Sequence, residues 1–122
     1  MLTASAFAQS PQRAQFPNDT YSLVQIADGI HAFIAPEPGS GIVQGNITLI
    51  IGEESCLVVD TGQFPLLAER MVADIRKLTP KPVKYVLNTH WHGDHLLVNV
   101  AFQKAWPSAT FISTGFTRRK IA

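Results

Sequence analysis

A run of eight residues, from Asn88 to His95, constrains this chain more than any other segment. It reads Asn-Thr-His-Trp-His-Gly-Asp-His, so three of the four histidines lie within six residues, together with a carboxylate. For a chain of this composition, the pattern His-x-His-x-Asp-His arises by chance with a probability on the order of 10⁻⁴. The run follows a short apolar segment at residues 83–87, and in an extended turn His90 and His92 can point to one side. The sequence therefore predicts a strand that ends in a metal-binding loop.

The side chains of this loop suit a particular group of metals. Imidazole and carboxylate together are ligands for Zn²⁺, and also for Fe²⁺ or Mn²⁺. Asp94 and His95 are adjacent and can face a second position, so the loop predicts a site for one or two ions. In a two-metal site, a bridging water loses a proton near neutral pH and attacks an activated carbonyl or phosphoryl centre. We discount a solvated loop without metal, because it needs no such spacing, and a serine nucleophile, because no G-x-S-x-G elbow is present.

The rest of the chain predicts strands first and then strands that alternate with helices. Asp28-Gly29 is a hairpin turn signal between two strand-like segments, and Gly52-Glu53-Glu54 joins a second such pair. The expected strands are 21–26, 30–34, 46–51, 55–59, 83–87 and 110–113, and the expected helices are 66–78, 96–105 and the opening of one at 114–122. This order predicts an α/β fold, a sandwich with helices on a sheet.

Two of these segments carry expectations about burial. Leu67, Met71, Ile75 and Leu78 step by four, four and three, which predicts one apolar stripe on the first helix. The segment 55–59 is apolar for most of its length, as expected of a strand buried on both faces.

Composition excludes several classes of protein. Hydrophobic residues make up 46% and charged residues 16% of the 122 residues, which excludes an intrinsically disordered chain. The net charge is +1 and no long basic block occurs, so we expect no nucleic-acid partner. No apolar run approaches the ~18 residues of a membrane span. The single cysteine, Cys56, excludes an internal disulfide framework.

The first twenty residues predict a leader followed by a flexible lead-in. Ala6-Phe7-Ala8 has the small-x-small form of a secretory cleavage site, and residues 9–20 are polar and carry prolines. We read residues 1–20 as a signal-peptide remnant and lead-in, which implies a periplasmic or secreted protein. If they are only an Ala/Ser-rich terminus, the protein is cytoplasmic. Residues 21–122 form the predicted domain.

The pattern His90-x-His92-x-Asp94-His95 resembles the signature of the metallo-beta-lactamase superfamily, and Asp60-Thr61-Gly62 resembles its upstream motif. The resemblance implies an αββα sandwich of which residues 21–122 are the N-terminal half. It makes His90 and His92 ligands of a first metal, and Asp94 and His95 ligands of a second. Asp60 would orient a ligand histidine and set its tautomer. The alternative for Asp60 is a carboxylate in a turn at the end of a strand.

The resemblance also implies a function. It implies a metal-dependent hydrolase that uses zinc. In such an enzyme a metal-bound hydroxide would attack an ester, thioester, lactam or related bond of a small-molecule substrate, with Asp94 as the catalytic residue. The sequence identifies no substrate-binding residue, and Trp91 either lines the substrate cleft or packs the loop. Two alternatives stay open: a mononuclear-iron oxidoreductase of the same superfamily, and a non-enzymatic metal-binding half-domain or pseudo-enzyme.

The chain departs from the family in its later ligands. No histidine follows His95, and Asp94 is the last acidic residue. His31 lies upstream in a predicted strand, and we interpret it as structural. We therefore expect a truncated chain that needs a missing C-terminal half to complete the site. Alone, it would be unstable, poor in metal and largely inactive.

Overall fold

A computed structural model describes residues 21–35 and 43–122 of the chain. The predicted leader and lead-in, residues 1–20, lie outside the described residues, as do residues 36–42. The described part forms one six-stranded sheet whose strands follow the order of the sequence. These strands are β1 (Ser22–Ala27), β2 (Ile30–Ile34), β3 (Ile47–Ile51), β4 (Cys56–Val59), β5 (Val83–Asn88) and β6 (Thr110–Ser113).

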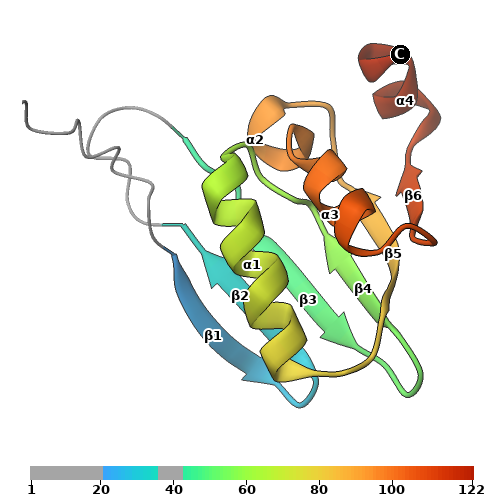
Figure 1. The fold of residues 1–122 in the computed structure, drawn as a ribbon. Helices are drawn as coiled ribbons and strands as arrows, with labels where there is room; N and C mark the ends of the chain where they lie inside the picture. Colours follow the sequence, from blue (N-terminus) through green and yellow to red (C-terminus); the bar gives the residue numbers. More distant parts are fainter. Residues whose placement is uncertain (1–20, 36–42) are drawn as a thin grey trace, which may run out of the picture.

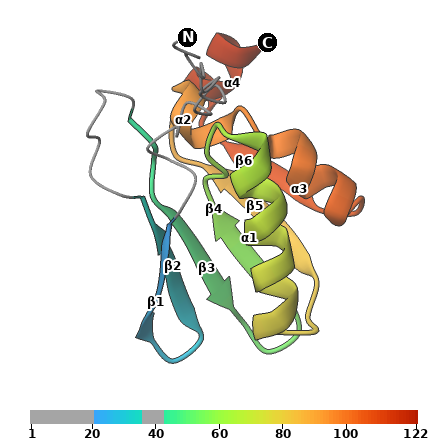
Figure 2. The same ribbon diagram turned by 60° about the vertical axis from the view of Figure 1, so that its left-hand side comes forward.

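Two hairpins and two crossovers build this sheet (Figure 1). The pairs β1–β2, β2–β3 and β3–β4 are antiparallel, and β4–β5 and β5–β6 are parallel. Parallel neighbours need a crossover, which helices supply here. Helix α1 (Pro65–Leu78) joins β4 to β5; α2 (Gly93–Leu96) and α3 (Asn99–Ala105) join β5 to β6; and α4 (Gly115–Ile121) follows. The predicted mixed α/β fold is confirmed, and the view in Figure 2 shows α2 and α4 at the same end of the sheet.

Helix α1 follows the predicted pattern with one exception. It begins at Pro65, where the missing N–H costs nothing, and it ends before Thr79-Pro80. Leu67, Met71 and Ile75 are buried as predicted. Leu78 was predicted to share their stripe, but it is 37% exposed because it is the last residue of the helix.

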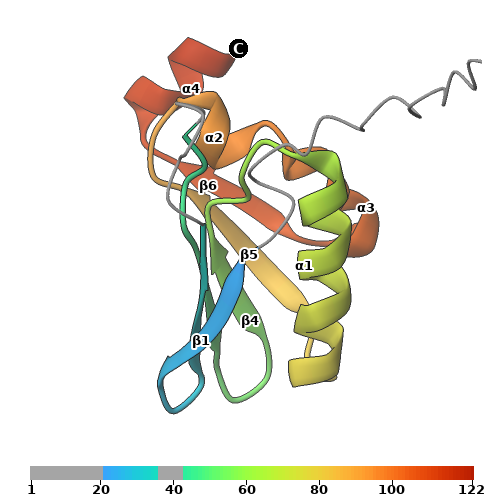
Figure 3. The same ribbon diagram turned by 90° about the vertical axis from the view of Figure 1, so that its left-hand side faces the viewer.

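The core lies between the sheet and its helices. Figure 3 shows α1 and α3 on the same side of the sheet. Side chains of four strands and α3 meet there without exposure, namely Phe33, Leu49, Val58, Val86 and Phe102. The prediction that β4 is buried on both faces is wrong. Cys56 and Val58 are buried, but Leu57 and Val59 are only partly buried, since alternate residues of a strand face opposite sides.

The predicted helix at 96–105 is two helices. Helix α2 starts earlier, at Gly93, and α3 starts at Asn99. The break falls at Val98, whose φ of −103° and ψ of 21° are not helical. The Val98 N–H donates to the Gly62 carbonyl at 3.2 Å instead of continuing the helix, and its side chain is buried. The tertiary contact therefore overrides the helical propensity.

Among residues 21–35 and 43–122, no helix has both the length and the apolar character that crossing a membrane requires.

Candidate metal centre

The predicted site residues lie at the carboxyl ends of β4 and β5. Asp60 follows β4 directly, and the loop with the three histidines follows β5. These ends meet at one edge of the sheet because the strands are parallel and adjacent. The Asp60 N–H donates to the Leu87 carbonyl of β5 at 2.8 Å, which fixes Asp60 beneath the loop.

Asp60 is the buried centre of this arrangement. It is 3% exposed and has a φ of 62°, the left-handed region that aspartate enters more readily than most residues. Its Oδ1 accepts the Thr89 N–H at 2.8 Å, and its Oδ2 accepts the Thr89 hydroxyl at 2.7 Å. The same Oδ2 lies 2.8 Å from Nδ1 of His95. The backbone turn after β4 thus places a carboxylate where it contacts both Thr89 at the start of the loop and His95 at its end.

The histidine rings gather above this carboxylate. The centroid of the His90 ring lies 4.7 Å from that of His92 and 4.0 Å from that of His95. His90 Nδ1 lies 2.9 Å from the Thr89 hydroxyl. His95 Nε2 lies 3.2 Å from Oδ2 of Asp94. The structure therefore brings all five sequence-predicted site residues into one cluster.

The side chains of the cluster are of the types that bind transition metals, but too few of them converge on one point. Imidazoles beside a carboxylate are the ligands that Zn²⁺ takes in catalytic sites. A catalytic zinc ion usually has three protein ligands. Across the described ranges, no three His, Cys, Asp or Glu side chains converge as a group that holds a metal ion. In this structure both ring nitrogens of His95 contact carboxylates: Nδ1 lies 2.8 Å from Asp60 and Nε2 lies 3.2 Å from Asp94.

Four polar residues that the sequence analysis did not assign to the site support it. Thr89 binds Asp60 twice, as described above. The Thr61 N–H donates to the His95 carbonyl at 2.8 Å, and the Thr61 hydroxyl donates to Asn99 Oδ1 at 2.9 Å. Asn88 and Asn99 form a reciprocal amide pair, with N···O distances of 3.1 and 2.8 Å. Of these four residues, only Asn88 had a signal in the sequence, because it is a polar residue at the end of an apolar strand.

A glycine also shapes the site. The backbone at Gly45 packs so closely on the loop that a Cβ there would lie 2.8 Å from the Asp94 carbonyl oxygen and 2.8 Å from Cε1 of His95. The Gly45 N–H points to that Asp94 carbonyl at 3.3 Å. Only glycine permits this approach without displacement of the His95 ring. This contact joins segments about fifty residues apart, so no local pattern in the sequence could predict it.

Trp91 both packs and remains accessible. Its ring meets the His92 ring edge-on at 4.7 Å, and Lys120 Nζ lies 5.8 Å from its centroid. The side chain is still 42% exposed. His31 belongs to β2, where it pairs with Leu49 and Gln25, and its Nδ1 is buried without a hydrogen-bond partner among the described residues.

Comparison with known proteins adds a family and several relatives. The family model of the metallo-beta-lactamase superfamily matches residues 40–118. A linear primary-alkylsulfatase from Pseudomonas sp. is 35% identical over 48 residues, which are 39% of this chain and 9% of the relative. An atrochrysone carboxyl ACP thioesterase from Passalora fulva is 32% identical over 85 residues, which are 69% of this chain and 25% of the relative.

Solved structures share the fold. A metallo-beta-lactamase from Pseudomonas aeruginosa, crystallised in a mono-zinc form, matches with a TM-score of 0.64 and 17% identity. The match covers 84% of this chain and 46% of that one. The chain thus spans a quarter or less of the two curated relatives and just under half of the crystallised protein.

Proposed function

The chain belongs to the metallo-beta-lactamase superfamily, and from this premise we propose that it carries part of the active site of a zinc-dependent hydrolase. His90 and His92 would bind a first ion, and Asp94 and His95 would bind a second. The observation that carries the proposal is the position of His95, whose Nδ1 lies 2.8 Å from the buried carboxylate of Asp60.

Asp60 supports the proposal through the tautomer that it selects. A carboxylate that accepts the Nδ1–H of a histidine leaves the Nε2 lone pair free to bind a metal and raises its basicity. Asp60 also holds Thr89 by two hydrogen bonds, so the same group fixes the residue that precedes His90. Asp60 is therefore a positioning residue, which acts on the metal through other side chains.

Each side chain of the loop then has a distinct task. When bound, zinc lowers the pKa of a coordinated water and polarises the substrate oxygen. Asp94, whose Oδ2 lies 3.2 Å from His95 Nε2, would hold the second ion together with His95 and is the residue to which we assign the catalytic role. Trp91, exposed beside His92, would contact the apolar part of a substrate and exclude bulk water.

The relatives support a substrate class for this proposal. Two of them are named as a sulfatase and a thioesterase, and both names denote hydrolysis of an ester-type bond. We propose a small-molecule ester, thioester, lactam or sulfate ester as the substrate.

Further ligands have to complete the site. Fewer than three donors converge within the described residues, so we propose that residues outside this chain, such as those of a C-terminal half, supply the others. The same observation favours a second candidate function, a metal-binding half-domain without turnover.

Zinc titration of the full chain tests the proposal. A chromophoric chelator in competition gives the zinc affinity of the wild type and of three variants, and thioester and alkyl-sulfate hydrolysis is assayed on the same samples. We expect His92→Ala and Asp60→Asn each to weaken zinc binding about 10-fold to 100-fold. His31→Gln is the matched control, because it removes a histidine outside the cluster and should bind zinc as the wild type does.

The two readouts separate the candidates. Zinc-dependent turnover that a chelator abolishes supports the hydrolase. Zinc binding that depends on His92 and Asp60 without turnover supports the half-domain. Zinc affinity that is the same in all four proteins would show that the loop is not the metal centre.

A further inference from the structure

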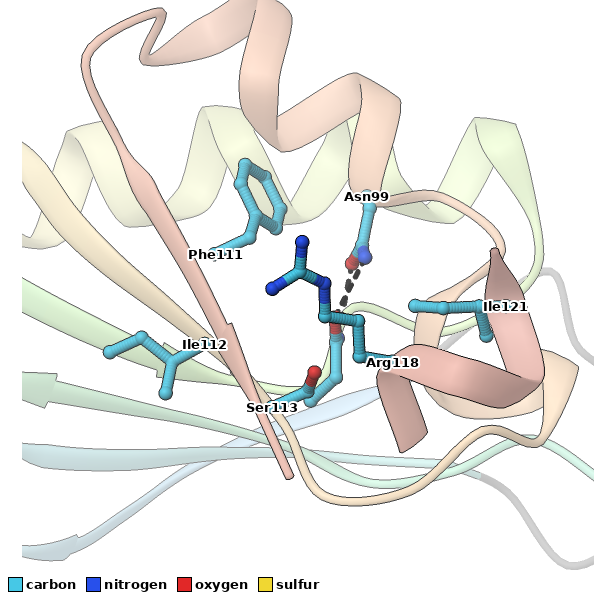
Figure 4. Close-up of a pocket in the computed structure, with 7 residues that line it drawn as sticks. Asn99, Phe111, Ile112, Ser113, Arg118 and Ile121 are labelled. Carbon is cyan, nitrogen blue, oxygen red and sulfur yellow. Dashed lines mark hydrogen bonds between the residues drawn. The ribbon is translucent and has the colours of Figure 1, made fainter. Parts of the chain in front are cut away.

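A cavity lies between the carboxyl end of β6 and helix α4 (Figure 4). Its volume is about 440 Å³, within the range of roughly 300–1,000 Å³ that is typical of small-molecule sites. Three elements and a strand end contribute its walls: β6, α3, α4 and Asn88 at the end of β5. It is therefore formed by tertiary packing and not by one loop.

The cavity contains one cation, Arg118, which has no hydrogen-bond or ion-pair partner for its guanidinium among residues 21–35 and 43–122. Arg118 lines it, and Figure 4 shows the guanidinium in the space between Phe111 and Asn99. Within the described part of the chain, the Arg118 guanidinium makes no hydrogen bond or ion pair. None of the lining residues is acidic. The positive charge is thus free to bind a ligand.

The other polar groups divide into one that is available and two that are not. Ser113 lines the cavity, and its hydroxyl makes no hydrogen bond with any of the described residues. The amides of Asn88 and Asn99 also line it, but they bind each other at 3.1 and 2.8 Å. Available hydrogen bonding is therefore concentrated at Arg118 and Ser113, and both of these side chains donate.

The remaining walls are apolar. Phe111 and Ile121 face the cavity, and Ile121 is 45% exposed, whereas the Ile112 side chain points to the other side of β6 (Figure 4). A ligand that covers them gains from the removal of this surface from water. The planar fork of an arginine matches a carboxylate through two parallel hydrogen bonds.

We propose that this cavity, defined by Arg118, Ser113, Phe111 and Ile121, binds a small organic anion that joins a carboxylate to an apolar body. The proposal goes beyond the zinc hydrolase, because none of these four residues belongs to the metal cluster and binding needs no metal. The amide pair lies against both regions, since Asn99 also accepts the Thr61 hydroxyl. The side-chain amide signals of Asn88 and Asn99 should therefore report occupancy.

Titration with octanoate tests the proposal on the full chain, in the presence of a chelator so that metal plays no part. Nuclear magnetic resonance follows the side-chain amides of Asn88 and Asn99. We expect saturation at a dissociation constant on the order of 1 mM, from the usual efficiency of small ligands. Octan-1-ol, which lacks the charge, and acetate, which lacks the apolar body, should each bind at least tenfold more weakly.

Arg118→Gln and Arg119→Gln form the matched pair. Both remove one positive charge from an exposed position of α4, but only Arg118 lines the cavity. Octanoate affinity should fall at least tenfold in Arg118→Gln and stay within twofold of the wild type in Arg119→Gln. Ser113→Ala should lower the affinity severalfold, and thermal melting establishes that each variant is folded.

Three results would overturn the proposal. One is equal loss in Arg118→Gln and Arg119→Gln, which would indicate attraction by net charge alone. Another is octan-1-ol binding as tightly as octanoate, which would indicate an apolar surface without anion recognition. The third is saturable octanoate binding that leaves the Asn88 and Asn99 amides unchanged, which would place the ligand elsewhere. None of these results bears on zinc, so the zinc hydrolase would stand or fall separately.

Discussion

Two neighbouring rows of residues cross the sheet, and they differ in what covers them. One row runs from β1 to β6 on the side of α1 and α3, and the strand pairings place Gln25, His31, Leu49, Val58, Val86 and Phe111 in it. The adjacent row faces the other side, and the same pairings place Val24, Ala32, Thr48, Val59, Leu87 and Ile112 in it. Leu49, Val58 and Val86 of the first row have no exposure, whereas Val24 and Ile112 of the second are 45% and 40% exposed.

The difference shows that apolar sequence and burial are separate properties. Both rows carry mostly apolar side chains, but only the first has helices packed on it (Figure 3). A soluble monomer seldom leaves a contiguous apolar face uncovered, and such a face usually binds something. This agrees with the proposal that the site is completed from outside this chain, since a partner that brings ligands would also bring a surface.

The largest effect should come from adjacent residues of β3 that face opposite sides. Leu49→Ala removes a fully buried side chain, and we expect it to lower the free energy of unfolding by about 2–5 kcal/mol. Ile50→Ala removes a similar side chain from the open face, where it is only partly buried, and should cost about 1 kcal/mol. Urea denaturation measures both. Equal losses would show that the open face is covered in solution.

A smaller effect should come from the contact that closes the edge of the covered face. The Tyr21 hydroxyl donates to Asp74 Oδ2 of α1 at 2.6 Å, and the Tyr21 ring meets Phe33 edge-on at 5.1 Å. Tyr21→Phe keeps the ring and removes the hydrogen bond. We expect a loss of about 1 kcal/mol at neutral pH, because Asp74 is partly accessible to solvent.

The loss of stability in Tyr21→Phe should become smaller at both acid and alkaline pH. The Tyr21 hydroxyl, and then Lys77, holds the pKa of Asp74 below its ordinary value. The resulting stability is present above an unfolded pKa of about 3.9 and is lost as pH falls through the lower folded pKa. Burial, and then the bond to Asp74, raises the pKa of Tyr21, so that stability is lost as pH rises above about 10. Unfolding of both proteins between pH 3 and pH 11 checks this. A difference that stays constant over the whole range would contradict it.

The smallest effect on stability should come from the open face itself. Val24→Thr and Ile34→Thr change side chains that are 45% and 37% exposed, and each should alter the free energy of unfolding by no more than about 0.5 kcal/mol. The double variant should nevertheless bind less of the dye ANS, because that dye reports accessible apolar surface. Undiminished dye binding would place the accessible apolar surface elsewhere on the molecule.

The local signals in the sequence predicted most of the elements. The turn at Asp28-Gly29 and the hairpin at Gly52-Glu53-Glu54 are present, and the helix predicted over residues 66–78 is present with its start one residue earlier, at Pro65. The sequence failed at Val98, where a hydrogen bond to Gly62 splits a helix, because the competing contact comes from a residue far along the chain. The export signal in residues 1–20 stays a prediction.

The site shows the same division. The spacing of four residues that are close in sequence was enough to predict them as metal ligands, namely His90, His92, Asp94 and His95. Asp60 was nominated by its motif, but its hydrogen bonds to Thr89 and His95 exist only because β4 and β5 are adjacent.

Most strands and helices of this chain, and the metal-type side chains of its loop, could be predicted from the sequence alone, because periodicity and short spacings are local properties. Three features needed the fold: which apolar residues are covered, the close approach of Gly45 to His95, and the position of Arg118 in a cavity where no described residue pairs with its guanidinium. These features depend on distances between segments that are far apart along the chain, and a linear pattern carries no record of such distances.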